Sequence, residues 1–285
     1  MKISIFFFSG TGNTWWVTQK IKEVFEEKDH SVGVYSIERK DLNWENLLPT
    51  LLNESDVIGI GFPVYGSQIP FIMRDWVKNI LSNYSKEHKK KLRGFVYDTM
   101  AMFSGDTPLL MKKLLIKGGF QVKQAINIRT LSNLPQMKSL MTWEKEKQEK
   151  ILIKAEKKIR KFVDKIIENK KWIMRRDPFT RFIAVFQRVG FKWEENRFRK
   201  LFIIDNDRCN LCRICVKYCP VNNLSIEETT EKPIVKYGQD CIFCMRCFNN
   251  CPTNAIIVMK RTRNVVKYRR FRDQIPDFKL SLLKE

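Results

Sequence analysis

The sequence predicts an α/β protein: a doubly wound parallel sheet of five strands, then a helical connector, and then a small α+β domain. Three observations predict this organisation. Apolar runs and amphipathic segments alternate over residues 1–140 at the spacing of βαβ units. Apolar residues then recur at helical spacing among many charges at 142–171. All eight cysteines follow in one short region.

The first half of the chain alternates strands and helices. We expect strands at 3–8, 32–37, 56–62, 94–100 and 120–128, with helices at 14–27, 69–81 and 107–118. The run DVIGIGF at 56–62 is typical of a strand buried on both faces of a parallel sheet. No apolar run approaches the roughly 20 residues of a membrane span. The run Ile3 to Phe8 is too short for a signal peptide, so we expect a cytoplasmic protein.

A loop rich in glycine and hydroxyl groups, SGTGNT at 9–14, follows the first strand. Backbone N–H groups at the start of a helix bind anions. Gly10 and Gly12 let the backbone approach a ligand, and Ser9, Thr11 and Thr14 add hydroxyl groups. The loop has no lysine and lacks the spacing of the GxxxxGK[ST] and GxGxxG loops. The alternative is a tight turn in a domain that binds no cofactor.

This loop resembles that of the flavodoxins, whose first loop reads (S/T)x(S/T)GN(T/S) and wraps the phosphate of FMN. The resemblance covers about residues 1–135 and implies a flavodoxin-like fold, with the FMN phosphate on Ser9, Gly10, Thr11, Gly12, Asn13 and Thr14. In that family, the loops after the third and fourth strands hold the flavin ring. The corresponding residues are Pro63, Val64, Tyr65, Gly66, Thr99, Met100 and Phe103, of which Tyr65 and Phe103 are expected to stack on the ring.

Two cysteine runs carry the strongest signal, CNLCRICVKYCP at 209–220 and CIFCMRCFNNCP at 241–252. Each reads C-x₂-C-x₂-C-x₃-C-P, the run of bacterial two-cluster ferredoxins, in which the fourth cysteine ligates the other cluster. That resemblance implies one [4Fe–4S] cluster on Cys209, Cys212, Cys215 and Cys251, and a second on Cys241, Cys244, Cys247 and Cys219. A zinc site would use four cysteines, and disulfides would need an oxidising compartment.

Basic residues flank the cysteines: Arg208, Arg213, Lys217 and Arg246. Positive charge near a cluster favours its reduced state, so we expect higher potentials than in an acidic ferredoxin. If these side chains are fully solvated, the effect is small.

The net charge of +22 is concentrated outside the cysteine region. Residues 141–205 carry 19 Lys and Arg against 10 Asp and Glu, and residues 259–285 carry 9 against 3. The segment KKWIMRRDPFTRFIAVFQRVGFKW at 170–193 mixes aromatic and basic residues, as interfacial helices do. We expect an acidic redox protein as partner, or contact with an anionic membrane surface. The alternative is that the aromatic residues pack between domains. No nucleic-acid-binding motif accompanies the charge, so we expect no nucleic-acid partner.

With both motifs in one chain, the protein resembles the iron–sulfur flavoproteins of anaerobes. They imply an FMN domain at 1–140, a basic helical connector at 141–202, a two-cluster ferredoxin domain at 203–258 and a basic tail at 259–285. We expect an electron-transfer protein that relays electrons between two [4Fe–4S] clusters and FMN. The alternatives are an FMN-dependent reductase of a small organic substrate, fed by the clusters, and a non-redox protein with structural clusters. The sequence offers no acid–base pair, nucleophile–His pair or nicotinamide motif, so no catalytic residue is assigned.

Overall fold

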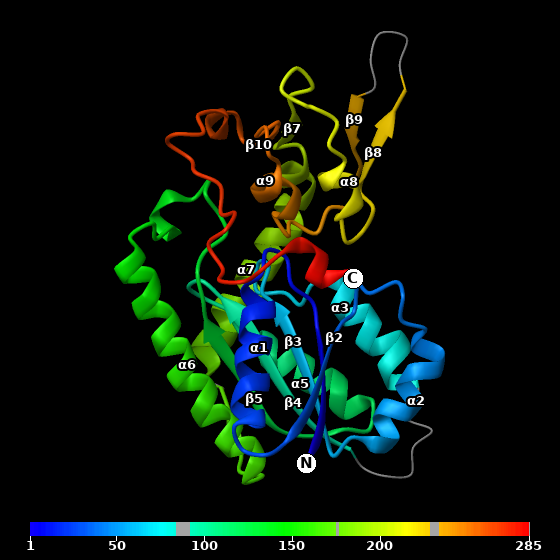
Figure 1. The fold of residues 1–285 in the computed structure, drawn as a ribbon. Coiled ribbons are helices and arrows are strands. Elements are labelled where there is room, and N and C mark those ends of the chain that lie inside the picture. Colours follow the sequence, from blue (N-terminus) through cyan, green and yellow to red (C-terminus); the bar gives the residue numbers. More distant parts are fainter. Residues whose placement is uncertain (84–91, 175–176, 229–233, 285) are drawn as a thin grey trace.

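A six-stranded parallel sheet forms the N-terminal part of the chain in the computed structural model, which describes all residues except 84–91, 175–176, 229–233 and 285 (Figure 1). Its order is β2-β1-β3-β4-β5-β6. The strands are β1 (Lys2–Phe7), β2 (Ser31–Ser36), β3 (Val57–Pro63), β4 (Arg93–Met100), β5 (Gln121–Arg129) and β6 (Trp172–Ile173). The order of the first five strands is that of the flavodoxin-like doubly wound fold, which confirms the predicted fold class.

Helices cover both faces of the sheet (Figure 1). One core contains α1 (Asn13–Glu26) and α6 (Lys145–Ile167). The opposite core contains α2 (Trp44–Glu54), α3 (Phe71–Trp76), which continues as a π-helical turn at Val77–Leu81, and α5 (Thr107–Lys117). Side chains alternate across β1, so Ile3 and Ile5 join the first core and Phe6 joins the second. The sheet is therefore buried on both faces, as its apolar strands predict.

Two elements of this domain were not predicted. Helix α2 was missed, although the Asn43 side chain caps it by accepting hydrogen bonds from the N–H groups of Glu45 and Asn46. Pro49 lies inside α2 and obscures its helical pattern. The sheet also has a sixth strand, because the two residues of β6 pair with β5 beyond the predicted five strands. A two-residue strand is too short to show any periodicity.

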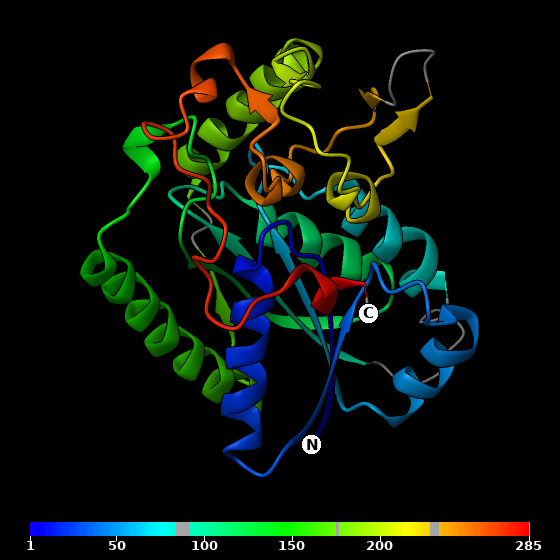
Figure 2. The same ribbon diagram turned by 45° about the horizontal axis from the view of Figure 1, so that its top comes forward.

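The predicted connector begins as part of the sheet domain. Ile159, Phe162 and Val163 of α6 are buried in the core that α1 shares. The apolar stripe of α6 thus covers one face of the sheet, and α6 does not serve as a free spacer. The second helix of the segment, α7 (Pro178–Arg199), lies at the periphery next to the cysteine-rich part (Figure 2).

The C-terminal part is a small α+β unit, as predicted. β7 (Phe202–Ile204) pairs antiparallel with β10 (Ile256–Val258) and so joins the two ends of the cysteine region. β8 (Leu224–Glu227) pairs antiparallel with β9 (Ile234–Tyr237). The short helices α8 (Ile214–Lys217) and α9 (Arg246–Asn250) each begin two residues after the second cysteine of a run and contain the third. Six of the eight cysteines therefore lie on loops, and Cys215 and Cys247 lie in the two short helices.

The tail after β10 returns to the sheet domain. It makes 3₁₀ turns at Lys260–Arg263 and Leu280–Leu283, and Figure 2 shows it (orange to red) crossing the end of α1. Phe271 and Ile275 enter the core beside α1. Within the described residues, no helix has both the length and the apolar character needed to cross a membrane.

Candidate functional site

A pocket of about 160 Å³ opens at the carboxyl ends of β1, β3, β4 and β5. β1 lies between β2 and β3, so the chain connections diverge at this edge, where doubly wound sheets bind their ligands. Eleven of the predicted flavin residues line the pocket: Ser9, Gly10, Thr11, Asn13, Thr14, Pro63, Val64, Tyr65, Gly66, Thr99 and Met100. The structure therefore brings together three loops that lie far apart in the sequence.

The first loop presents free backbone donors to this pocket. The Ser9 hydroxyl accepts hydrogen bonds from the N–H groups of Gly12 (3.2 Å) and Trp15 (3.3 Å), which closes the loop on itself. Among the described residues, the N–H groups of Gly10, Thr11, Asn13 and Thr14 have no hydrogen-bond partner. Gly12 has a φ of 99°, a left-handed conformation that favours glycine. The start of α1 is thus arranged as an anion site.

Side chains from other strands fix the loop hydroxyls. Thr14 Oγ1 lies 2.8 Å from Thr99 Oγ1 at the end of β4. Asn133 Nδ2, which follows β5, donates to Thr11 Oγ1 at 2.9 Å. Asn13 Nδ2 donates to the carbonyl oxygen of Leu131 at 3.0 Å, and the buried Asn13 Oδ1 has no partner among the described residues. The loop is therefore held by the segment after β5, which the sequence analysis did not include.

Two predicted residues lie elsewhere. Phe103 does not line the pocket. Gly12 faces outward, where a Cβ would lie 2.6 Å from the ring of Phe278 in the tail. Aromatic residues that were not assigned to the pocket, Phe191 of α7 and Phe243 of the second cysteine run, line it instead. Their rings meet edge to face with centroids 5.4 Å apart.

The hydrogen-bond donors of the pocket would suit a flavin that carries a phosphate ester. N–H groups without a partner in the described chain gather with hydroxyl groups in the first loop, and Tyr65, Phe191 and Phe243 provide aromatic walls that would suit a ring. A Cβ at Gly66, which has a φ of 57°, would lie 2.5 Å from the ring of Phe191, so glycine lets the helix approach this loop. The Tyr65 hydroxyl is buried without a partner in the described chain, and burial raises the pKa of Tyr65 well above its ordinary value.

The cysteines form two groups around two separate hollows. Cys209, Cys212, Cys215 and Cys251 line one, and Cys219, Cys241, Cys244 and Cys247 line the other. Each group takes three cysteines from one run and one from the other, which is the grouping expected from crossed ligation. No three His, Cys, Asp or Glu side chains in the described ranges are placed to hold a single metal ion. A [4Fe–4S] cubane sets its four thiolates further apart than one ion does.

The two runs have matching backbone geometry. Left-handed residues flank the second cysteine of each run, Leu211 and Arg213 in the first and Phe243 and Met245 in the second. The fourth cysteines also correspond, since Cys219 Sγ accepts from the N–H of Asn223 and Cys251 Sγ accepts from the N–H of Ala255, both at 3.2 Å. Such N–H···S bonds are among the groups that set cluster potentials. The residues after the proline differ between the runs, VNN at 221–223 and TNA at 253–255, and this difference leaves the N–H···S bond intact.

Burial affects the protonation of the thiols. It raises the pKa of Cys244 to about 12 and that of Cys215 to about 11. A buried thiolate needs a positive partner. Iron would supply that charge, because a thiol that coordinates metal is deprotonated.

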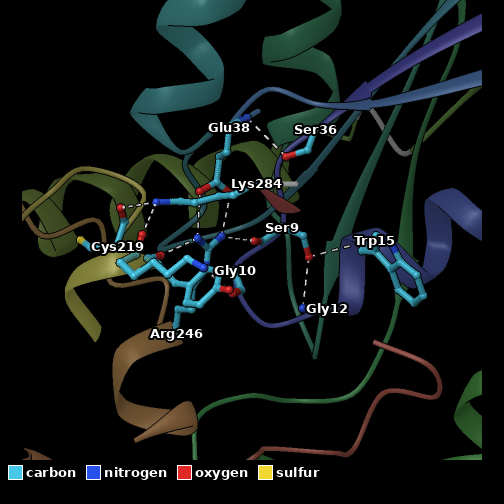
Figure 3. Close-up of polar contacts among 11 residues, drawn as sticks. Ser9, Gly10, Gly12, Trp15, Ser36, Glu38, Cys219, Arg246 and Lys284 are labelled. Carbon is cyan, nitrogen blue, oxygen red and sulfur yellow. Dashed lines mark hydrogen bonds and ion pairs between the residues drawn. The ribbon is translucent and has the colours of Figure 1, made fainter. Parts of the chain in front are cut away.

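Arg246 joins the second cysteine run to the first loop (Figure 3). Its side chain is 1% exposed and lies between the positions of Cys244 and Cys247 in the chain. It donates to the carbonyl oxygens of Gly10 (2.9 Å) and Ser9 (2.6 Å) and to both carboxylate oxygens of Glu38 (2.8 and 2.7 Å). Desolvation lowers the pKa of Arg246, but the Glu38 carboxylate outweighs it, so the pKa lies above its ordinary value. The alternative that the basic side chains beside the cysteines are fully solvated is wrong for Arg246, because its guanidinium is buried among the loop carbonyl oxygens and the Glu38 carboxylate.

Close packing accompanies this ion pair. A Cβ on Gly10 would lie 2.5 Å from the Tyr65 hydroxyl and 2.8 Å from the carbonyl oxygen of Cys244. The tail closes the other side, where Lys284 Nζ donates to the carbonyl oxygens of Lys217 (2.7 Å) and Cys219 (3.1 Å) (Figure 3). Gly10 therefore lets the first loop and the second cysteine run approach each other. The sequence predicted for Gly10 only that it lets the backbone approach a ligand.

Residues 208–255 match the family of the 4Fe–4S dicluster domain. The chain joins a flavodoxin-like domain to a 4Fe–4S dicluster domain. The family match supports iron–sulfur clusters in the cysteine region. The boundaries predicted for the four segments, and the ligand role of each site residue, stay predictions.

Solved flavodoxins are similar to the N-terminal part. A flavodoxin from the domain Archaea has 19% identity and a TM-score of 0.39, over 56% of this chain and 99% of its own. Flavodoxin 2 from Bacillus cereus has 19% identity and a TM-score of 0.39, over 59% and 99%. The two-electron reduced flavodoxin of Megasphaera elsdenii has 22% identity and a TM-score of 0.36, over 48% and 94%. The fold assignment rests on the strand order of this chain. No curated protein matches the sequence.

Proposed function

We propose that this protein relays electrons between two [4Fe–4S] clusters and FMN within one chain. The observation that carries the proposal is Arg246, which lies in the second cysteine run and binds the backbone of Ser9 and Gly10 in the flavin loop. When bound, the clusters supply one-electron chemistry and the flavin accepts one or two electrons. The cysteine groupings and the free N–H groups of the first loop support the assignment of the cofactors.

The residues of the chain hold the two sites in contact. Tyr65 lines the flavin pocket. Its hydroxyl and the carbonyl oxygen of Cys244 lie 2.5 and 2.8 Å from the place that a Cβ on Gly10 would take. Phe243, beside Cys244, lines the same pocket. One cluster loop thus forms part of the flavin pocket wall, which keeps the second cluster next to the flavin without a diffusive encounter.

The test is rapid mixing of the oxidised full-length protein with a reduced ferredoxin, with flavin absorbance as the readout. The matched variant, Cys219→Ala with Cys251→Ala, removes one ligand of each cluster. We expect flavin reduction at least about tenfold slower in this variant, because the donor must then reach the flavin directly. Equal rates would show that the clusters are not on the path. A small organic substrate that reoxidises the flavin in many turnovers would favour the alternative, a flavin-dependent reductase.

A further inference from the structure

The outer face of α7 is the main apolar surface of the described chain. Of the large hydrophobic side chains that are exposed, Phe179, Phe182, Ile183, Val185, Phe186, Val189 and Trp193 all belong to this one helix. Phe182, Phe186 and Trp193 are 70%, 76% and 87% exposed. Their spacing of four and seven residues places them in one stripe along the helix. Monomeric proteins rarely expose a contiguous apolar patch of this kind without a partner.

The opposite face of α7 already has its partners. Ala184 is buried against the loop of Gly105, Gln187 accepts a hydrogen bond from Ser67, and Arg188 pairs with Asp106. Phe191 lines the flavin pocket. The helix is therefore fixed by one side, and its aromatic side points away from the protein. The alternative that these aromatic residues pack between the domains is wrong for Phe182, Phe186 and Trp193.

Basic residues outnumber acidic residues in this helix. The helix carries five Lys and Arg against two Glu, in a chain of net charge +22. Lys171, Arg181 and Lys200 are exposed at or near its ends. A helix with aromatic and aliphatic residues on one side and Lys and Arg beside them has the composition of a helix that lies in a membrane interface. Tryptophan is a preferred residue at that depth.

We propose that the outer face of α7 binds the surface of an anionic lipid bilayer. A bilayer fits the observations better than a second copy of the chain, since two copies would bring charges of +22 together. A bilayer also accounts for an apolar stripe on one exposed helix, because a lipid surface needs no complementary groove. Such binding would place the flavin pocket, which Phe191 of the same helix lines, next to the membrane surface.

The experiment is sedimentation of the full-length protein with vesicles of phosphatidylcholine alone or with phosphatidylserine added. The patch variant carries Phe182→Ser, Phe186→Ser and Trp193→Ser. A matched control carries Ile153→Ser, Met137→Ser and Val266→Ser, which are exposed at 50%, 46% and 85% on other segments. We expect the wild type and the control to sediment with the phosphatidylserine vesicles at low salt. We expect at least about a tenfold weaker partition for the patch variant, because each aromatic side chain contributes by leaving water.

Several results would overturn the proposal. The first is that the wild type does not sediment with vesicles, and the second is that it sediments equally with neutral vesicles. The third is that the patch variant partitions as the wild type does, which would leave charge alone as the cause of binding. A wild type that is dimeric by light scattering, with a monomeric patch variant, would assign the stripe to self-association. Loss of lipid binding with cofactor content unchanged would show that the variant is folded and support the proposal. None of these readouts depends on electron transfer.

Discussion

At the scale of single residues, the contact between the two sites depends on one buried ion pair. The side chains of Arg246 and Glu38 are 1% and 2% exposed. Two buried charges stabilise a protein only when both are present, since either one alone keeps its desolvation cost. Glu38 follows β2 and Arg246 opens α9, so the pair also fixes how the sheet domain meets the cluster loops.

Removal of the Glu38 carboxylate tests this pair. Glu38→Gln leaves the Arg246 guanidinium buried without a counter-charge, and we expect the free energy of unfolding to fall by about 3–5 kcal/mol. The measurement is urea unfolding of the holoprotein. Asp41→Asn, which breaks the exposed pair with Arg39, is the control and should change nothing measurable. A Glu38 variant as stable as the wild type would contradict the role of the pair.

The crossed grouping of the cysteines makes a second prediction. Intact protein should hold about eight iron and eight acid-labile sulfide per chain. Cys219→Ala should damage the cluster of Cys241, Cys244 and Cys247, because Cys219 lies in that group. Iron analysis and electron paramagnetic resonance measure the loss. Cys251→Ala is the matched variant and should damage the other cluster; a reversed pattern would contradict the grouping.

The phosphate position can be tested at Thr11. Thr11→Glu puts a carboxylate beside the free N–H groups of the loop, so it should compete with the phosphate and abolish flavin retention. Thr11→Ser keeps the hydroxyl that accepts from Asn133 and should retain flavin. The readout is the flavin content after purification. Full flavin content in the glutamate variant would place the phosphate elsewhere.

At the scale of elements, the contact between β4 and α5 contains a buried carboxyl, since Asp98 accepts a hydrogen bond from the Thr107 hydroxyl at the start of α5. Burial raises the pKa of Asp98 well above its ordinary value, although the Thr107 hydroxyl and Lys158 of α6 lower it. A carboxyl with a higher pKa in the folded chain stabilises the fold at low pH, and this contribution is lost as the pH rises through the folded pKa. The free energy of unfolding should therefore fall as the pH rises, because ionised Asp98 is buried between β4 and α5.

Asp98→Asn should remove this pH dependence. We expect the variant to gain about 1–2 kcal/mol of unfolding free energy over the wild type at about pH 9 and less at about pH 5, since the amide has no charge to desolvate. Urea unfolding at both pH values measures the difference. Asp75→Asn, with a side chain 43% exposed, is the control. A gain that is equal at both pH values would contradict titration of Asp98.

Local patterns predicted most of these elements, while contacts between distant segments could not be predicted. The apolar run of β3 and the cysteine spacing each reflect constraints within a few residues, so both were readable. Asn133 and Phe191 line the flavin pocket through tertiary packing, and neither has a local motif. Burial of the Arg246 guanidinium could not be predicted from the sequence, because it depends on Glu38, which lies 208 residues earlier.

At the scale of the whole molecule, the charge of +22 determines how an acidic redox protein would approach. Positive charge attracts an acidic ferredoxin, and salt shortens the range of this attraction by screening. We expect the second-order rate of reduction by such a ferredoxin to fall about tenfold or more from low to high salt. Stopped-flow mixing measures this rate. A neutral small-molecule reductant is the control, and equal salt dependence for both would argue against steering.

The long separation between the flavin loop and its partner has a consequence for the order of assembly. Ser9 and Gly10 precede Arg246 by 237 and 236 residues. At a synthesis rate of 5–20 residues per second, the loop leaves the ribosome about 10–50 s before the arginine that binds its carbonyl oxygens. β6, the last strand of the sheet, ends 73 residues before Arg246, so the sheet domain can fold and take up its ligand while the loop is still open on the side later covered by the cluster domain and by Phe278. Flavin loading should thus precede iron–sulfur loading during biosynthesis, and the later segments would close over a pocket that is already filled.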